Sequence, residues 1–506
     1  MAFNTFQFIL VFLPLVYLGF LAVHRFLGWG GVYPYLAVMS LVFYAQFSLL
    51  LAAILVASVV LNFVAANLIR RAREAGGPAG LMTTAAITAN IFALGYFKYT
   101  NFFIDIANSV GGGGFSHLNI IVPVGVSFFT FTQIGFLLES YSGQAGKVGF
   151  AKYSLFATFF PVVAAGPLLL QREIFPQMED KQGPAFSTVA LSVGLTMFGI
   201  GLFKKVIIAD SIAPYANLAF DGVALGAGID MLNAWMGSLA YTFQLYFDFS
   251  GYSDMAVGLG FMFGLKLPLN FNSPFKATSI SDFWRRWHMT MTRFFTTYLY
   301  TPMAMTNTRK AMKGGYGPVR RWLAASAVPV TYTFVLAGIW HGAGWTFVVY
   351  GLVHGLALAV NHGWRHFKMV DLGPQIGWLL TMLVVVVGLV IFRAPDLGVA
   401  GSMLSSMFGL NLINGTAPSA DMVSLDAFTT LSMIAVLAAL VMTAPNSQEI
   451  LRSNWISCDD ETDGASDTLN PIRWQPTAVW AAIAAGMLVL AFTSLGGDGN
   501  FLYYSF

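Results

Sequence analysis

The feature that most constrains this chain is a series of apolar segments, most of them long enough to cross a lipid bilayer. Runs of about 18 mostly apolar residues recur along the 506-residue chain, and a helix of that length spans the ~30 Å hydrocarbon core of a membrane. Only 10% of the residues are charged, against about 25% in soluble domains. The sequence therefore predicts an all-α polytopic membrane protein.

We expect about 11–13 membrane segments in all, because several of the apolar runs are short or interrupted. The candidate spans are residues 6–24, 32–47, 48–69, 82–104, 119–138, 152–170, 185–209, 231–250, 252–266, 322–340, 345–362, 376–393, 426–444 and 476–495. No internal repeat is evident in the sequence, which weighs against a transporter built from inverted repeats.

The chain divides into three predicted parts. Residues 1–118 hold N-terminal transmembrane helices, residues 119–362 a core, and residues 363–506 C-terminal transmembrane helices with a polar loop at 446–475. The first segment lacks a basic start and a small-residue cleavage site, so we expect a retained helix and not a signal peptide.

A basic segment at 267–321 lies inside the predicted core. From Arg285 to Arg321 there are eight basic residues and no acidic one, and lysine and arginine in short loops favour the cytoplasmic side. Its first half, 267–305, is interrupted by prolines, asparagines and arginines. Because irregular backbone at membrane depth must be buried in protein or line an aqueous cavity, we expect re-entrant or interfacial helices around a funnel open to the cytoplasm.

The strongest candidate for chemistry is His341, which stands in an otherwise apolar run. Ionisable residues within membrane segments are costly and are functional candidates by default. Small neighbours would let a substrate or another backbone approach, and indole rings would exclude water. A neutral imidazole is suited to taking a proton from a hydroxyl, but close helix packing around a hydrogen-bonded histidine fits the residue types equally well. The small neighbours of His341 are Gly338, Gly342 and Gly344, and the indole rings belong to Trp340 and Trp345.

A second histidine, His288, ends a basic and aromatic cluster. Two arginines could pair with phosphates, and two tryptophans could stack on a flat ring. The alternative is a cytoplasmic anchor with an aromatic belt. No metal site is predicted, because no HExxH motif is present and Asp282 is the only nearby carboxylate. The tentative donor-binding residues are Arg285, Arg286, Trp284 and Trp287.

Polar residues also stand among aromatic ones upstream, at Asp248, Ser250 and Asp254. We expect them to form a buried hydrogen-bond network around a helix break at Gly251 and to support the site structurally. His354 lies on one helical face with Tyr350, and we expect it to make structural hydrogen bonds.

At these residues the chain resembles the membrane-bound O-acyltransferase family, in particular the bacterial branch that acetylates polysaccharides such as alginate. The resemblance covers roughly residues 120–360, and the terminal FLYYSF (501–506) is also similar. The matching stretches are VPVGVSFFTFTQIGF (122–136), FFPVVAAGPLLLQREIFPQ (159–177), GLFKKVIIAD (201–210), AYTFQLYFDFSGYSDMAVGLG (240–260), NFNSPF (270–275), DFWRRWHMTMTRFFTTYLYTPM (282–303) and GIWHGAGWTFVVYGLVHG (338–355).

The resemblance implies a helical bundle around a transmembrane tunnel, with His341 as the catalytic histidine and His288 as the second family histidine. It implies acetyl-CoA as donor substrate and no bound cofactor. The acetyl group would pass to an extracytoplasmic, alginate-like polysaccharide, through a periplasmic SGNH-type acetyltransferase partner. We expect a multi-pass protein of a bacterial inner membrane, surrounded by lipid and without a nucleic-acid partner.

Two alternatives stay open at this point. Within the same fold, the chain could transfer D-alanine to teichoic acid or acetylate peptidoglycan. From another class, it could be a transporter or flippase for lipid-linked sugars, although such proteins place charges along a midplane pathway.

Overall fold

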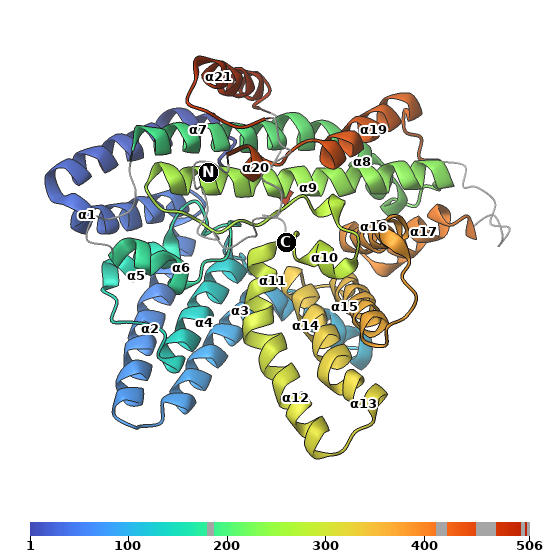
Figure 1. Cartoon of the computed structure of the whole chain (residues 1–506), viewed down its shortest axis with the longest axis horizontal. Coiled ribbons are helices and arrows are strands. Elements are labelled where there is room, and N and C mark those ends of the chain that lie inside the picture. Colours follow the sequence, from blue (N-terminus) through green and yellow to red (C-terminus); the bar gives the residue numbers. More distant parts are fainter. Residues whose placement is uncertain (180–186, 411–421, 452–471, 497–500, 503–506) are drawn as a thin grey trace. The chain divides into compact units, whose positions relative to one another are not determined.

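The computed structural model describes residues 1–179, 187–410, 422–451, 472–496 and 501–502. These residues form helices and connecting segments, with no strand among them (Figure 1). The chain divides into two compact units. Unit 1 comprises Met1–Val206, Gly251–Leu269 and Ser447–Ser505, and unit 2 comprises Ile207–Ser250 and Asn270–Asn446. The middle of the polar loop predicted at 446–475 lies outside the described residues.

Within the described residues, six helices are long and apolar enough to cross a membrane. They are Gln7–Ala45, Leu49–Glu74, Ala79–Gly111, Thr188–Ala224, Pro318–His341 and Gly373–Arg393. Shorter apolar helices occupy Leu397–Met407, Ala427–Thr443 and Ala478–Thr493. The predicted all-α membrane class is confirmed, while the total of about 11–13 segments stays a prediction.

Unit 1 is built mainly from the N-terminal helices. They are η1 (Gln7–Phe12), α1 (Leu13–Ala45), α2 (Leu49–Glu74), α3 (Ala79–Gly111), α4 (Val126–Ser142), α5 (Phe150–Thr158), α6 (Gln171–Glu179) and α7 (Thr188–Phe203), with α20 (Ser447–Leu451) and α21 (Ala478–Thr493) from the C-terminal part. The spans predicted at 6–24 and 32–47 fall on one helical run that is interrupted at Gly28, whose φ of 61° suits a residue without a side chain.

Polar side chains connect the helices of unit 1. Asn62 of α2 and Asn90 of α3 exchange two amide hydrogen bonds of 3.1 and 2.8 Å. Gln133 of α4 donates to Ser58 of α2 at 3.0 Å and accepts from Tyr153 of α5 at 3.3 Å. Such interhelical bonds hold helices together where the surroundings offer no water.

Unit 2 contains most of the core predicted from the sequence. Its elements are α8 (Asp210–Ala224), η3 (Pro274–Lys276), α10 (Ile280–Trp284), α11 (Met289–Phe295), η4 (Thr296–Tyr300), α12 (Thr301–Lys313), α13 (Pro318–Trp322), η5 (Leu323–Ala327), α14 (Val328–His341), α15 (Trp345–His366), α16 (Gly373–Arg393), α17 (Leu397–Met407) and α19 (Ala427–Thr443). Two further elements, η2 (Lys204–Ala209) and α9 (Met231–Met262), contribute residues to both units.

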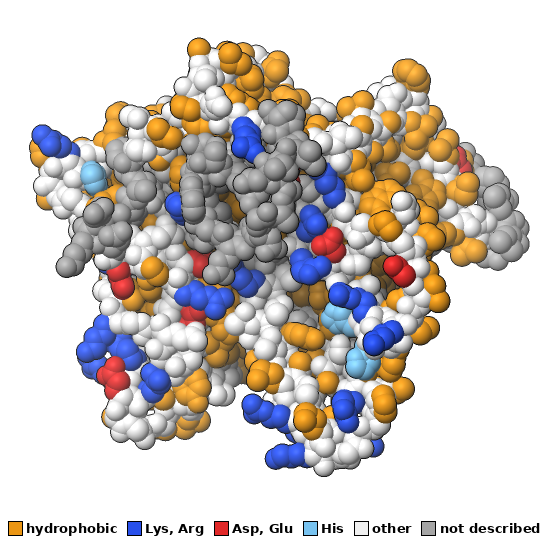
Figure 2. Space-filling model, in the orientation of Figure 1, with side chains coloured by type: hydrophobic (Ala, Val, Ile, Leu, Met, Phe, Trp, Pro, Cys, Tyr) orange, Lys and Arg blue, Asp and Glu red, His pale blue; other side chains and the backbone are white. Residues whose placement is uncertain are grey.

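The second half of the basic segment belongs to a helical hairpin that extends to His341. One continuous run goes from α11 through η4 to α12, and a second goes from α13 through η5 to α14. Gly314 and Gly315 separate the two runs, and Gly315 has a φ of 62°. Lysines and arginines gather around the turn of the hairpin, where α12 ends and α13 begins (Figure 2). They are Arg309, Lys310, Lys313, Arg320 and Arg321.

Glycines bring α14 and α15 into backbone contact. A Cβ added at Gly338 would lie 2.2 Å from the carbonyl oxygen of Phe347. One added at Gly351 would lie 2.3 Å from the carbonyl oxygen of Phe334. Small residues four apart, here Gly351 and Gly355, are typical of close helix pairs in membranes. This contact fixes α14, and with it His341, against α15.

The predicted helix break at Gly251 is wrong, because α9 runs without interruption from Met231 to Met262. The spans predicted at 231–250 and 252–266 therefore belong largely to one helix. A Cβ at Gly251 would lie 2.7 Å from the carbonyl oxygen of Gly201. This glycine thus permits a close backbone approach within unit 1 and does not end the helix.

Candidate active site

His341 is the last residue of α14 and is buried, with 6% of its surface exposed. Its ring lies 4.7 Å from that of Trp340, 6.0 Å from that of Tyr350 and 5.1 Å from that of Phe392, measured between centroids. The imidazole therefore sits in an aromatic enclosure formed by the ends of α14, α15 and α16.

The glycines around His341 have two different surroundings. Gly338 makes room for the backbone of α15, and a Cβ at Gly342 would lie 2.0 Å from the ring of Phe347. Of the two uses that the sequence left open, approach of another backbone is therefore the one seen at Gly338. Trp345 lies at the surface of the unit with 55% exposure, so Trp340 is the tryptophan that encloses His341.

His288 occupies the turn between α10 and α11 and is fully buried. Its φ of 44° is in the left-handed region, which is uncommon for a residue with a side chain. The Nδ1 atom lies 3.2 Å from Oδ1 of Asn270, and the ring packs edge-on against Phe249 at 4.7 Å. Burial lowers the pKa of His288 to about 3, so this imidazole is neutral at physiological pH.

One side chain contacts both histidines. The Trp340 ring lies 6.0 Å from the His288 ring and 4.7 Å from the His341 ring, and only 4% of it is exposed. Unit 2 thus brings the two predicted catalytic histidines to the same indole, although they belong to different helical runs.

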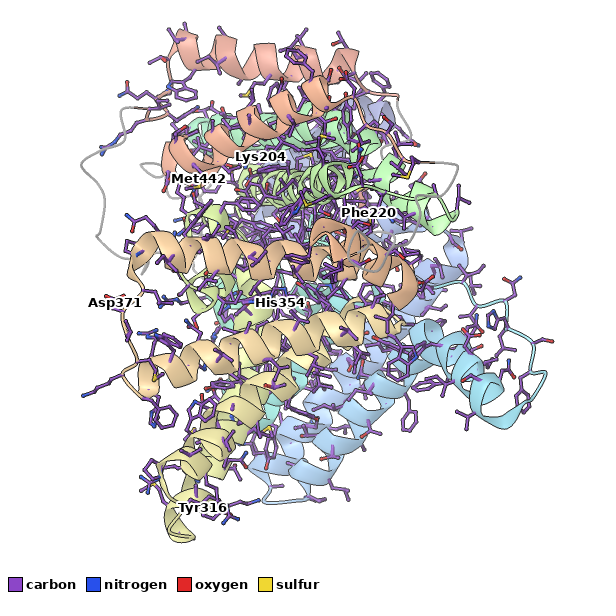
Figure 3. The ribbon with its side chains drawn as sticks, turned by 90° about the vertical axis from the view of Figure 1, so that its right-hand side faces the viewer. Lys204, Phe220, Tyr316, His354, Asp371 and Met442 are labelled. Atoms are coloured by element: carbon purple, nitrogen blue, oxygen red, sulfur yellow. The ribbon has the colours of Figure 1, made fainter. Side chains whose placement is uncertain are left out.

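A third buried histidine lies near His288 and His341, and the sequence did not predict this proximity. His354 of α15 is buried, and its ring lies 4.7 Å from that of Tyr350, which also contacts His341. The indole nitrogen of Trp284 donates to His354 Nδ1 at 3.3 Å, which confirms the expected structural hydrogen bond. His354 is labelled in Figure 3. The one sequence signal was its spacing of four residues from Tyr350.

The predicted donor-binding residues are two arginines with different exposures and two buried tryptophans. Asp282 contacts Arg286 at 3.1 Å and Arg285 at 3.5 Å, and the Arg285 side chain is 70% exposed. Trp284 and Trp287 are buried at 4% and 5% exposure. Arg285 is therefore accessible to an anionic ligand and Arg286, at 33% exposure, is partly so, whereas the tryptophans pack inside the unit.

The predicted supporting residues on α9 fall in different units. Asp248 and Ser250 are buried in unit 2 with 1% exposure each. Asp254 belongs to unit 1, where its Oδ2 lies 2.6 Å from Nζ of Lys204 and accepts from the hydroxyl of Ser447. Asp254 thus has an ion-pairing role there, and support of the site by Asp248 and Ser250 stays a prediction.

Fold and site together define a class: a multi-pass membrane protein with two buried histidines on a shared tryptophan. The model of the membrane-bound O-acyltransferase family matches residues 43–369. The chain belongs to this family and is an O-acyltransferase, which confirms the predicted class of enzyme.

Relatives extend the match beyond that region. The chain is 38% identical to a peptidoglycan O-acetyltransferase of Helicobacter pylori, over 81% of this chain and 80% of the relative. It is 32% identical to the probable alginate O-acetylase AlgI of Azotobacter vinelandii over the whole of both chains. A teichoic acid D-alanyltransferase of Bacillus subtilis is 28% identical over 47% of this chain and 59% of the relative. These relatives give no support to the transporter alternative.

Proposed function

We propose that this enzyme moves an acetyl group from cytoplasmic acetyl-CoA across a bacterial inner membrane to a hydroxyl of an extracytoplasmic, alginate-like polysaccharide. It would do so without a bound cofactor. The observation that carries the proposal is the burial of His288 and His341 against Trp340 in a chain of the O-acyltransferase family. Two relatives with O-acetylation in their names support acetyl as the transferred group.

In the proposed reaction His341 is the general base. Its imidazole takes the proton of the attacking hydroxyl as that oxygen bonds to the thioester carbonyl carbon. The carbon–sulfur bond then breaks, and the released CoA thiolate is protonated. General-base assistance of this kind contributes about 10²–10⁴-fold to the rate. His288 either orients the acyl donor or polarises its carbonyl.

The helical run that ends at His341 supports transfer across the membrane. It begins beside Arg320 and Arg321, whose charge favours the cytoplasmic side, and continues for 24 residues from Pro318. At 1.5 Å per residue, that run places His341 about 36 Å along the helix from the basic end. The donor would therefore enter from the basic side and the acetyl group would leave at the other.

Two groups of residues complete the proposed donor site. Arg285 is exposed and Arg286 partly exposed, and both would pair with the phosphates of CoA. Trp284 and Trp287 would act from inside the unit, by holding the segment that carries the arginines.

The acceptor has two candidates. An alginate-like polymer agrees with the full-length similarity to the alginate O-acetylase, and peptidoglycan agrees with the 38% identity to the peptidoglycan O-acetyltransferase. In both cases a periplasmic SGNH-type partner would complete the transfer.

The test is acyl transfer by the purified protein from radiolabelled acetyl-CoA, with and without a candidate periplasmic partner. Each polymer is offered in parallel, and D-alanyl donors serve as competitors. We expect label transfer by the wild type and none by His341→Ala. Full transfer by that variant would overturn the base assignment, and turnover of D-alanyl donors alone would overturn the acetyl assignment.

A further inference from the structure

The loop before α10 contains an amide that holds His288. Three hydrogen bonds converge on Oδ1 of Asn270. They come from Nδ1 of His288 at 3.2 Å, the hydroxyl of Thr290 at 2.6 Å and the backbone N–H of Thr290 at 3.4 Å. The backbone oxygen of Asn270 also accepts from the N–H of Met289 at 2.9 Å. Asn270 is therefore bonded to both sides of the His288 turn.

These contacts decide which ring nitrogen of His288 carries the proton. A backbone N–H can only donate, so the atom facing Thr290 must be the amide oxygen of Asn270 and not its nitrogen. An amide oxygen only accepts, so Nδ1 of His288 must be the donor in its contact with Asn270. A neutral imidazole with a proton on Nδ1 has a lone pair on Nε2.

We propose that Asn270 is a positioning residue that keeps His288 in the Nδ1–H form, so that Nε2 acts as a hydrogen-bond acceptor toward the acyl donor. This inference rests on the proposed function. It decides between the two roles left open for His288, because a lone pair cannot donate a hydrogen bond to a thioester carbonyl. The arm of a CoA thioester carries amide N–H groups, and such a group is the donor that Nε2 would hold.

The backbone conformation at this turn indicates that the surrounding contacts hold His288 in place. His288, in the turn before α11, and Ser273, in the loop that carries Asn270, both have positive φ values, 44° and 47°. Strained conformations of this kind persist where the surroundings impose them. Phe271, next to Asn270, packs on Phe249 at 5.0 Å, and Phe249 packs on the His288 ring. Phe249 therefore packs against both the segment that carries Asn270 and the ring of His288.

The first experiment reads the tautomer without any turnover. Protein with ¹⁵N-labelled histidine rings is reconstituted in lipid nanodiscs, and His288→Ala identifies the resonances of this ring by their loss. We expect an N–H signal from Nδ1 and a lone-pair signal from Nε2. The opposite assignment in the wild type would overturn the proposal, whatever the reaction proves to be.

The second experiment links the tautomer to catalysis. Asn270→Ala removes the acceptor, and we expect a mixture of tautomers with turnover reduced about 10- to 100-fold. Asn270→Asp keeps an acceptor at the same place, so it should keep the Nδ1–H form and restore part of the turnover. A purely structural asparagine would not show this rescue together with the spectroscopic change.

Asn272→Ala is the matched control. It removes an amide from the same loop, but the Asn272 side chain bonds to Asn446 at 3.1 Å and not to His288. We expect its tautomer signals and turnover to resemble the wild type. If Asn270→Ala kept both the wild-type tautomer and the wild-type turnover, the proposal would be wrong. If the wild type shows the expected tautomer but transfers no acetyl group, the result counts against the proposed reaction and not against the role of Asn270.

Discussion

The two units of this protein bury polar side chains in different ways. In unit 1 several buried or partly buried polar groups pair with one another. Asn62 and Asn90 exchange amide hydrogen bonds, and Lys204 contacts both Asp254 and Ser447 at 2.6 Å. Each partner offsets the cost of removing the other from water.

In unit 2 the buried histidines are surrounded by rings. Phe249, His288, Trp340, His341 and Tyr350 follow one another through ring contacts of 4.7 to 6.0 Å. The aromatic rings exclude water from both imidazoles, and an imidazole is the side chain best suited to exchanging a proton near neutral pH. The comparison leads us to expect structural roles for the polar pairs of unit 1 and a chemical role for the two catalytic candidates of unit 2, of which His288 also has Asn270 as a polar partner.

The largest expected effect is on turnover in unit 2. His341→Ala and His288→Ala should each reduce acetyl transfer, by about 10²–10⁴-fold for His341, with an unchanged unfolding temperature. Because both histidines serve one transfer, the double variant should lose little more than the worse single variant. His117→Ala is the control, since that imidazole is exposed beside Asp105. If the histidine variants unfolded at a temperature as low as that of a core deletion, their loss of turnover would no longer indicate a chemical role, and the contrast with the polar pairs of unit 1 would fail.

The next effect is on the stability of unit 1. Lys204→Met leaves the carboxylate of Asp254 without its cation. Breaking a fully buried pair costs about 3–5 kcal/mol, and this pair, with side chains 15% and 14% exposed, should cost somewhat less. Thermal unfolding in detergent should show a clear loss. The double variant Lys204→Met, Asp254→Leu should recover much of it, because no buried charge remains. A double variant as unstable as the single one would argue against a pairing role.

A third prediction concerns the helix contact that places His341. Gly351→Val would bring a side chain against the backbone of Phe334, and overpacking of this kind costs about 1–3 kcal/mol. Turnover should fall as well, because α14 shifts with its histidine. Gly95→Ala in α3 is the control, since a Cβ there meets nothing within 4 Å. Equal behaviour of the two variants would contradict the close contact of α14 and α15.

The smallest expected effect is at the paired amides of unit 1. Asn62→Ala removes one partner of Asn90, and interhelical hydrogen bonds in membranes contribute about 0.6–1.7 kcal/mol. We expect a small decrease in unfolding temperature and wild-type turnover. A tenfold loss of turnover would show that buried pairing does not mark a structural role.

The sequence by itself determined the membrane class and the two main histidines. Long apolar runs can only be helices where no water satisfies the backbone, and the helix predicted at 322–340 lies within Pro318–His341. His341 was selected because an ionisable residue in apolar surroundings is costly, and His288 because it ends a basic and aromatic cluster that resembles a family motif. Neither inference needed knowledge of which segments meet.

Only the tertiary structure decided how the polar residues are engaged. Local patterns suggested that Gly251 breaks a helix, yet α9 is continuous there and the glycine instead permits a close approach to the backbone of Gly201. Asn270 and His354 gained their importance from contacts with residues distant in the chain, at His288 and Trp284. A side chain's partner is set by the packing of whole helices, and periodicity and spacing in one sequence describe a single helix at a time.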